Sequence, residues 1–425
     1  MPLPEPHPLM VLPFVAMLLV IAIAPLTIKH HWERWYHLVA LGLGSISVFY
    51  YVAVLRHPAP MLHVAEEYAS FIGLVGSLYI VAGGIHIRVK GQATPAVNCL
   101  FLLIGAVLAN VVGTTGASML MVRPWLRMNR CRVTAYHVVF FIFIVSNVGG
   151  CLTPIGDPPL FLGYLKGVPF WWVAEHCWPA WCVGVGGLIA IFYVIDRRNF
   201  ARAPRDVSAR ETAHEEWRFY GLHNLAFLAL ILFAVFQPFG IREALMAAAA
   251  VGSWFTTRRA VHAANEFNFH PIKEVAWLFL GIFATMVPAL QYLERHAGEL
   301  PLHTEMQFYW LTGSLSGVLD NAPTYLAFLA AAFGKYGLNM DSPGDMHTFI
   351  AEHDHLLIAI SIGAVFFGAM TYIGNGPNFM VKSIAEQQKV EMPSFVGYLV
   401  RYALPVLLPF FFIIGLLFFS RWRVF

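Results

Sequence analysis

Two acidic residues, Asp157 and Asp320, lie in long apolar stretches of the chain, where they could exchange a proton for a cation. An ionisable side chain at membrane depth is costly, so it is a functional-site hypothesis by default. Burial disfavours an ionised carboxylate, whereas a helix N-terminus favours it. A carboxylate held between these two influences can bind either a proton or Na⁺. We therefore predict that Asp157 and Asp320 couple proton binding to ion binding.

A structural alternative applies to both acids. Each stands where a side chain would cap the N-terminus of a following helix, a role worth about 1 kcal/mol. The alternative is strongest for Asp157, because Pro158 and Pro159 follow it and proline is favoured in the first turn of a helix. Capping and ion binding do not exclude each other.

The motif T-x-I-G-[D/N]-x-P-x-F occurs twice, at residues 153–161 and 371–379, and both copies interrupt long apolar segments. Gly and Pro break a helix and free backbone polar groups that hydrocarbon cannot satisfy, so such backbone must be buried in protein or line a water-filled cavity. Two breaks in corresponding positions of two halves indicate the binding site of a secondary transporter.

Two further apolar stretches, 96–122 and 306–333, carry polar residues at their centres, and each precedes a break. We predict that both are re-entrant hairpins, which dip to the midplane and return. The alternative is an ordinary kinked span. For the first stretch the flanking charges favour a hairpin. Lys90 precedes it and four arginines follow it, and the positive-inside rule keeps both ends in the cytoplasm.

Two hairpin tips and two helix breaks should converge at the midplane and present amide, hydroxyl and backbone oxygens, which suit Na⁺. The predicted Na⁺ ligands are Asn110, Asp157, Asp320, Asn321 and Asn375. Further ion-binding or substrate-binding residues are predicted at Thr114, Thr115, Ser146, Asn147, Thr153, Thr324, Thr371 and Asn378. Na⁺ would be a substrate, and no cofactor is expected. No Lys or Arg lies close in sequence to these polar centres. A polyanionic substrate is often held by such cationic side chains, although helix N-termini can replace them.

The composition is that of a polytopic membrane protein embedded in a lipid bilayer. The chain has 425 residues, of which 58% are hydrophobic and 12% charged, whereas soluble domains carry about 25% charged residues. The net charge of +3 gives no indication of a nucleic-acid partner. No metal-ligand cluster and no nucleophile–base motif is evident in the sequence, so an enzyme is not expected.

Apolar runs of about 20 residues, long enough to cross a bilayer, predict ten crossings, five in each half. They lie near residues 9–27, 35–55, 68–87, 135–165, 171–195, 219–236, 241–257, 274–293, 354–388 and 398–420. Because five is odd, the second half enters the membrane from the opposite side. We therefore predict an all-α fold of two inverted repeats, each containing a re-entrant hairpin and a broken helix.

The predicted first repeat covers residues 1–195, with its hairpin at 96–122 and its broken helix at 135–165. The second covers 219–425, with its hairpin at 306–333 and its broken helix at 354–388. A cytoplasmic linker, 196–218, joins them. With the N-terminus outside, all but seven of the 27 Lys and Arg residues fall inside. Asp196, which ends a span, is expected to face the cytoplasm.

The chain resembles the NhaD-type sodium/proton antiporters and their relatives in the ion transporter superfamily. The resemblance rests on Asn110–Ser118 with the following Met-Leu-Met-Val-Arg-Pro, on Ser146–Pro159, on Leu319–Thr324 and on Gly374–Asn378. It covers most of the chain in order. It implies inverted repeats with two hairpins, a homodimer that moves by an elevator motion, and a bacterial inner membrane. It leaves the substrate open, because citrate, arsenite and dicarboxylate carriers share the architecture. The Ser-Asn-Thr tip signature of the dicarboxylate carriers is absent.

Two functions remain open. The first is antiport of Na⁺, or Li⁺, against H⁺ by alternating access, with Na⁺ and H⁺ as the partners. The second is cation-coupled transport of citrate or a dicarboxylate. A channel is less favoured, because two occluding hairpins suit alternating access better than a continuous pore.

Overall fold

The computed structural model describes residues 6–89, 93–202 and 218–420. These residues form an all-α polytopic membrane protein, as predicted, and eight of the described helices are long and apolar enough to cross a bilayer. The one sheet within the described residues pairs β1 (His86–Arg88) with β2 (Arg218–Tyr220) antiparallel, with Ile87 opposite Phe219.

The helices of the first half are α1 (Leu12–Thr27), α2 (Lys29–Phe49), α3 (Ala59–Gly83), α4 (Pro95–Met128), α5 (Ala135–Ile144), α6 (Pro158–Leu165) and α7 (Trp172–Arg202). Those of the second half are α9 (Asn224–Val235), α10 (Ile241–Thr256), α11 (Arg259–Ala264), α12 (His270–His296), α13 (Glu305–Ser316), α14 (Asn321–Lys335), α15 (Pro343–Phe367), α16 (Gly376–Gln387), α17 (Phe395–Tyr398) and α18 (Leu408–Phe419). A π-helical stretch, Leu399–Leu407, joins the last two and contains Pro405.

α4 turns back on itself. Its 34 residues would extend about 50 Å as one straight helix. Instead Gly113 has φ 76°, and the two side-chain amides of Asn98 and Asn129 exchange hydrogen bonds of 2.8 and 3.0 Å. Phe101 stacks on Trp125 with ring centroids 5.7 Å apart. The chain therefore leaves the tip close to where it entered.

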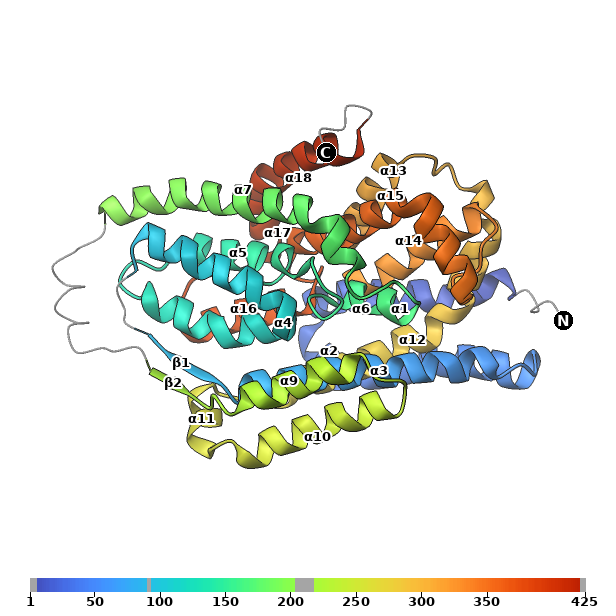
Figure 1. The fold of residues 1–425 in the computed structure, drawn as a ribbon, viewed down its shortest axis with the longest axis horizontal. Coiled ribbons are helices and arrows are strands. Elements are labelled where there is room, and N and C mark those ends of the chain that lie inside the picture. Colours follow the sequence, from blue (N-terminus) through green and yellow to red (C-terminus); the bar gives the residue numbers. More distant parts are fainter. Residues whose placement is uncertain (1–5, 90–92, 203–217, 421–425) are drawn as a thin grey trace.

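α13 and α14 form a second hairpin, whose ends are joined by a hydrogen bond from Lys335 Nζ to the carbonyl of Leu302 at 2.6 Å. Its tip lies between Ser316 and Asn321. Figure 1 shows α4 on one side of the centre and the α13–α14 hairpin on the other, so the two tips enter the protein from opposite ends.

The two breaks repeat the same local contacts. The first separates α5 from α6 and the second separates α15 from α16. In the first, Thr153 Oγ1 accepts from the Gly156 N–H at 3.1 Å. In the second, Thr371 Oγ1 accepts from the Gly374 N–H at 3.2 Å.

The hairpin tips bind these breaks in the same way. The Thr114 N–H donates to the Gly156 carbonyl at 2.7 Å, and the Asn321 N–H donates to the Gly374 carbonyl at 3.2 Å. Each hairpin tip is therefore hydrogen-bonded to the break of its own half.

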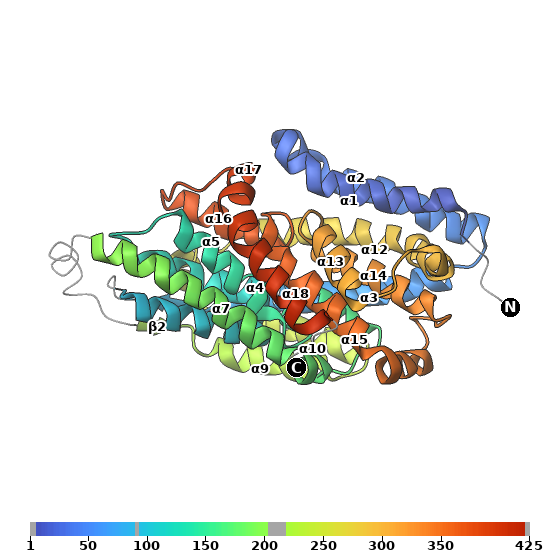
Figure 2. The same cartoon turned by 90° about the horizontal axis from the view of Figure 1, so that it is seen from above.

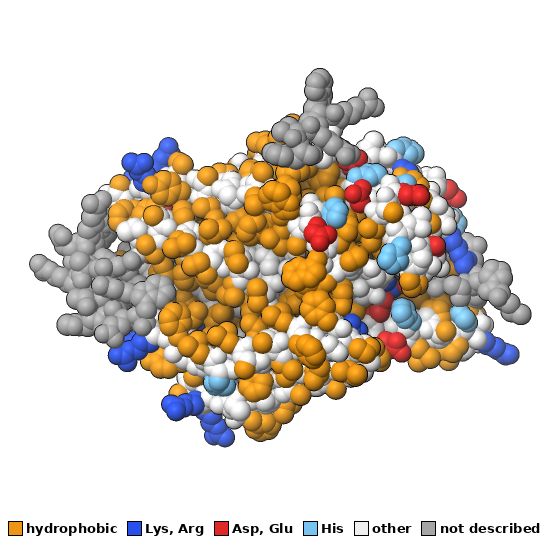
Figure 3. All heavy atoms as spheres, viewed as in Figure 1, with side chains coloured by type: hydrophobic (Ala, Val, Ile, Leu, Met, Phe, Trp, Pro, Cys, Tyr) orange, Lys and Arg blue, Asp and Glu red, His pale blue; other side chains and the backbone are white. Residues whose placement is uncertain are grey.

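Charge is unevenly distributed along the molecule. Lys and Arg side chains stand out at the end where α7 finishes, which we call the basic end, and acidic and histidine side chains gather toward the opposite, acidic end (Figure 3). Apolar side chains cover the surface between them. α1 and α2 lie together along one side (Figure 2). The inverted-repeat boundaries and the cytoplasmic linker stay predictions, and residues 203–217 of that linker lie outside the described residues.

Candidate functional site

Asp157 lies at the point where the four predicted elements meet. It is 1% exposed and belongs to the first break. Its Oδ1 accepts from Thr114 Oγ1 and from Asn375 Nδ2, both at 2.7 Å, and its Oδ2 accepts from Asn321 Nδ2 at 2.6 Å. These donors come from the first hairpin tip, the second break and the second hairpin. The carboxylate makes no capping hydrogen bond to α6, so the cap-only alternative does not describe Asp157.

Asp320 has the capping role instead. It is the N-cap of α14, and its Oδ1 accepts from the Ala322 N–H at 3.0 Å. Thr324 Oγ1 donates to the Asp320 carbonyl at 2.8 Å in the same turn.

Among the residues that the structure describes, two buried amide oxygens at the site have no hydrogen-bond partner: Asn147 Oδ1 and Asn321 Oδ1. The Nδ2 atom of Asn147 donates to Asn378 Oδ1 at 2.7 Å and to the Ile142 carbonyl at 2.8 Å. A buried acceptor without a donor costs about 1–3 kcal/mol. Hard oxygens of this kind are ligands for Na⁺, and a bound cation would satisfy them.

Gly368, which sequence analysis did not single out, lies against this pair of amides. A Cβ built on Gly368 would approach Asn147 Oδ1 to 2.9 Å and Asn321 Nδ2 to 3.3 Å. A methyl group would therefore fill the space beside the unpartnered oxygen. Gly368 is the first residue of the second break, but it lies outside the repeated motif at 371–379, on which the sequence prediction was based.

The remaining predicted residues mainly brace the breaks. Asn110 Oδ1 accepts from the Leu152 N–H at 2.8 Å, and its Nδ2 donates to the Gly149 carbonyl at 2.7 Å. The structure thus gives the side chain of Asn110 a bracing role, where sequence analysis expected a Na⁺ ligand. Other predicted residues make comparable bracing contacts through their side chain or backbone: Ser146, Thr153, Thr371 and Asn378.

A cavity of about 20 Å³ lies beside Asp157 and is also lined by Gly113, Thr114 and Thr115. A cavity needs roughly 10–15 Å³ on this measure to hold one water molecule. The cavity beside the carboxylate therefore has room for one water molecule or one small ion, and an organic acid would not fit in this conformation.

Asp196 is a second buried carboxylate, and the expectation that it faces the cytoplasm was wrong. It is 0% exposed and forms an ion pair with Arg132. His137 Nε2 lies 3.1 Å from its Oδ1, Tyr136 donates to it at 2.7 Å, and Asn98 donates at 2.9 Å. Because α4, α5 and α7 all contribute, the contacts fix these helices together and bury the charge.

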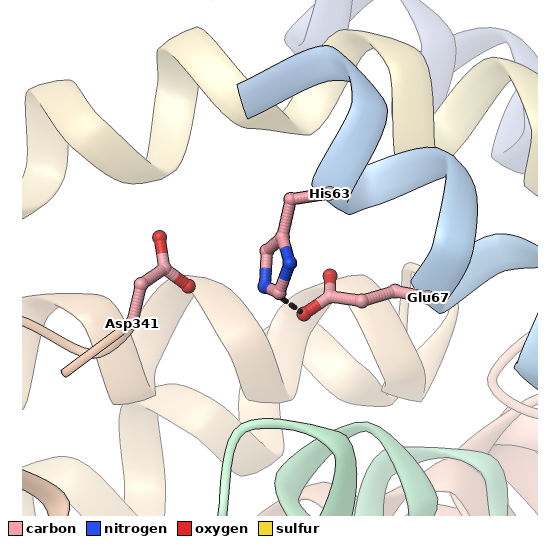
Figure 4. A group of neighbouring side chains, drawn as sticks. All are labelled: His63, Glu67 and Asp341. Carbon is pink, nitrogen blue, oxygen red and sulfur yellow. Dashed lines mark ion pairs between the residues drawn. The ribbon is translucent and has the colours of Figure 1, made fainter. Parts of the chain in front are cut away.

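A third cluster lies toward the acidic end, where His63, Glu67 and Asp341 place possible metal-ligand atoms within 4.8 Å of one another (Figure 4). Lys166 Nζ already lies 2.8 Å from Glu67 Oε1 and 2.6 Å from Asp341 Oδ1. Burial alone would lower the pKa of Lys166, but the two carboxylates outweigh it and raise the pKa. The ammonium group therefore occupies the position of a cation.

Two hairpin tips and two broken helices around a buried carboxylate form the core of a secondary transporter. A family model described as "Putative citrate transport" matches residues 5–419. The chain belongs to this family, which is part of the ion transporter superfamily. None of the curated proteins compared with the chain matches it.

Proposed function

We propose that the protein is a cation/proton antiporter that exchanges Na⁺, or Li⁺, for H⁺ by alternating access. One observation carries the proposal: the three side chains that hydrogen-bond the buried Asp157 carboxylate are all uncharged. A buried carboxylate without a cationic partner is costly, and either a proton or a metal cation neutralises it.

The surrounding amides provide oxygen ligands for Na⁺ and a hydrogen-bond acceptor for the protonated carboxyl. For Na⁺, the ligands are a carboxylate oxygen of Asp157 and the two unpartnered oxygens of Asn147 and Asn321. For H⁺, the protonated carboxyl needs an acceptor. Asn321 already donates to Asp157 through Nδ2, and rotation of its amide presents Oδ1 to the new proton. One carboxylate thus binds the two ions in competition, as antiport requires.

The two ends of the protein differ in a way that supports alternating access. At the acidic end, Lys166 links the segment after α6 to Glu67 on α3, and the adjacent cavity holds only about 40 Å³. Cavities of about 380 and 250 Å³ lie toward the basic end. With the basic end on the cytoplasmic side, the larger cavities lie on the cytoplasmic side of the buried site.

Proteoliposomes with an imposed pH gradient test the proposal. Na⁺ or Li⁺ added separately should dissipate the gradient, and K⁺ should do so much less. Asp157→Asn should abolish the response. A wild-type gradient that is insensitive to both Na⁺ and Li⁺ would exclude the proposal.

Cation-coupled transport of citrate or a dicarboxylate is the second candidate, and the family match favours it. In that case the same carboxylate and amides would bind the coupling cation. The same vesicles distinguish the candidates, because citrate uptake that requires Na⁺ would indicate the second function. Exchange of Na⁺ for H⁺ without citrate would indicate the first.

A further inference from the structure

A basic cavity of about 380 Å³ lies among the second arm of α4, β1 and the segment after α16. Its polar lining consists of Arg123, Arg127, Arg130, His86 and Gln388. Among the lining residues that the structure describes, none is acidic. The volume lies within the range of small-molecule sites, about 300–1,000 Å³. It is far larger than the single-ion cavity beside Asp157.

Arg123 is largely buried, with a side chain 11% exposed. Its Nη2 donates to Glu266 Oε2 at 3.0 Å, and Glu266 is itself 60% exposed. The Nε and Nη1 atoms of Arg123 are buried and have no hydrogen-bond partner in the described ranges of the chain. Buried polar groups are normally satisfied, and each exception calls for an explanation such as a bound ion.

From this geometry we infer that the basic cavity is a binding site for a compact oxyanion with two or more negative charges. Carboxylates and phosphates match the planar fork of a guanidinium group and accept two parallel hydrogen bonds from it. Three guanidinium side chains, those of Arg123, Arg127 and Arg130, line this one space. The inference goes beyond the proposed antiport and does not depend on it.

The neighbouring cavity of about 250 Å³ has the opposite character. Arg123 lines it as well, but so do Glu33, Glu266 and Glu274. Three carboxylates attract cations and repel a polyanion, so the anion belongs in the basic cavity. The two cavities share Arg123 but differ in the charge of their other lining residues.

Positive charge at a cytoplasmic end also serves topology without any ligand. Arg197, near the end of α7, is an arginine at the same end of the protein that does not line the cavity, and its side chain is exposed. It is therefore the matched control for the lining arginines.

The test measures anion binding to the full chain in phosphatidylcholine nanodiscs by calorimetry, with citrate and inorganic phosphate at constant ionic strength. Wild type should bind at least one of them saturably. Arg123→Gln and Arg130→Gln should each weaken binding by about tenfold, the loss of one charged hydrogen bond, and Arg197→Gln should leave it unchanged. Arg130 is exposed, so its variant reports on binding even if Arg123→Gln misfolds.

A lipid headgroup could supply the same chemistry, and native mass spectrometry with added cardiolipin distinguishes it. Retention of cardiolipin by wild type but not by Arg130→Gln, without binding of the soluble anions, would assign the site to a lipid phosphate. Absence of both soluble-anion and cardiolipin binding in wild type would overturn the inference. Equal affinities in wild type and in folded Arg123→Gln and Arg130→Gln proteins would also overturn it.

Discussion

Asp157 and Asp196 are both fully buried carboxylates, and each accepts hydrogen bonds from several side chains. Their partners differ in charge. Asp196 forms an ion pair with Arg132 and accepts from Tyr136. Within the described part of the chain, the side chains that donate to Asp157 are those of Thr114, Asn321 and Asn375, and all three are uncharged. The protein itself therefore neutralises the charge of Asp196, whereas the charge of Asp157 is left for a proton or a cation to neutralise.

The difference shows how the same residue type acquires two roles. A buried ion pair with good geometry offsets its own desolvation cost, and removing one partner typically costs about 3–5 kcal/mol. A carboxylate surrounded by amides has no such compensation. The environment at Asp196 suits a structural link between helices, and the environment at Asp157 suits reversible ion binding.

The largest expected effect comes from Asp157→Asn. The amide keeps the size of the side chain but can neither titrate nor bind a cation by charge. Na⁺-driven proton movement should fall by roughly 100-fold or more, because losing a charged ligand costs about 3 kcal/mol. A pH-sensitive dye in proteoliposomes measures the effect.

Asp320→Asn is the control for that variant, since Asn caps a helix about as well as Asp. It should keep both its fold and its Na⁺-dependent transport. Retention of the wild-type pH profile by Asp157→Asn would remove the contrast between Asp157 and Asp196.

Arg132→Gln tests the opposite side of the comparison. It leaves the Asp196 charge buried and unpaired, so stability should fall by about 3–5 kcal/mol. The thermal unfolding midpoint in detergent measures the loss. The double variant Arg132→Met/Asp196→Leu removes both charges and should recover much of it, while the folded fraction keeps its apparent Na⁺ affinity. If the single variant were as stable as wild type, Arg132 would not neutralise Asp196.

Gly368→Ala sharpens the assignment of the cation ligands. The added methyl group would press on Asn147 Oδ1 and Asn321 Nδ2, and overpacking of this kind costs about 1–3 kcal/mol. Apparent Na⁺ affinity in the transport assay should therefore weaken by about tenfold. Gly376→Ala is the matched control, because a Cβ there meets nothing within 4 Å. Equal effects of the two variants would place the cation elsewhere.

Lys166→Met should cause the smallest loss of stability among these charge-removing variants, about 2–3 kcal/mol. Glu67 loses a buried partner, whereas Asp341 is half exposed and stays partly solvated. The folded pKa of Lys166 lies above its usual value of 10.5. The stabilisation is thus fully present below 10.5 and is lost only as the pH rises through the folded pKa. The difference in unfolding midpoint between variant and wild type should therefore stay constant from about pH 6 to pH 9. A difference that disappears within that window would contradict the ion pair.

The fold class and the location of the polar breaks could be predicted from the sequence. Apolar runs of this length span a bilayer, and helix-breaking residues inside them must be buried in protein or line a water-filled cavity. The predicted span at 219–236 was too long. β2 pairs with β1 there, and Gly221, with φ 75°, turns the chain before α9 begins at Asn224. A pairing partner more than a hundred residues away leaves no local signal.

The difference between Asp157 and Asp320 could not be predicted either. Both precede helices and both could cap them, so local pattern gives them the same expectation. What separates them is the side chains that other elements bring to Asp157. The burial of Asp196 has the same origin, since Arg132 reaches it across 64 positions of sequence.

The lone charge on Asp157 has a consequence for leakage in the proposed antiport. An empty carrier holds a net negative charge at its centre, and a carrier loaded with one proton or one Na⁺ is electrically neutral there. Moving an uncompensated charge through low-dielectric surroundings costs several kcal/mol, whereas a neutral centre moves without that penalty. The empty form would therefore return slowly. Electrostatics would therefore suppress uncoupled transport, in which the carrier returns empty. After releasing one ion, the carrier would have to bind another before it could return.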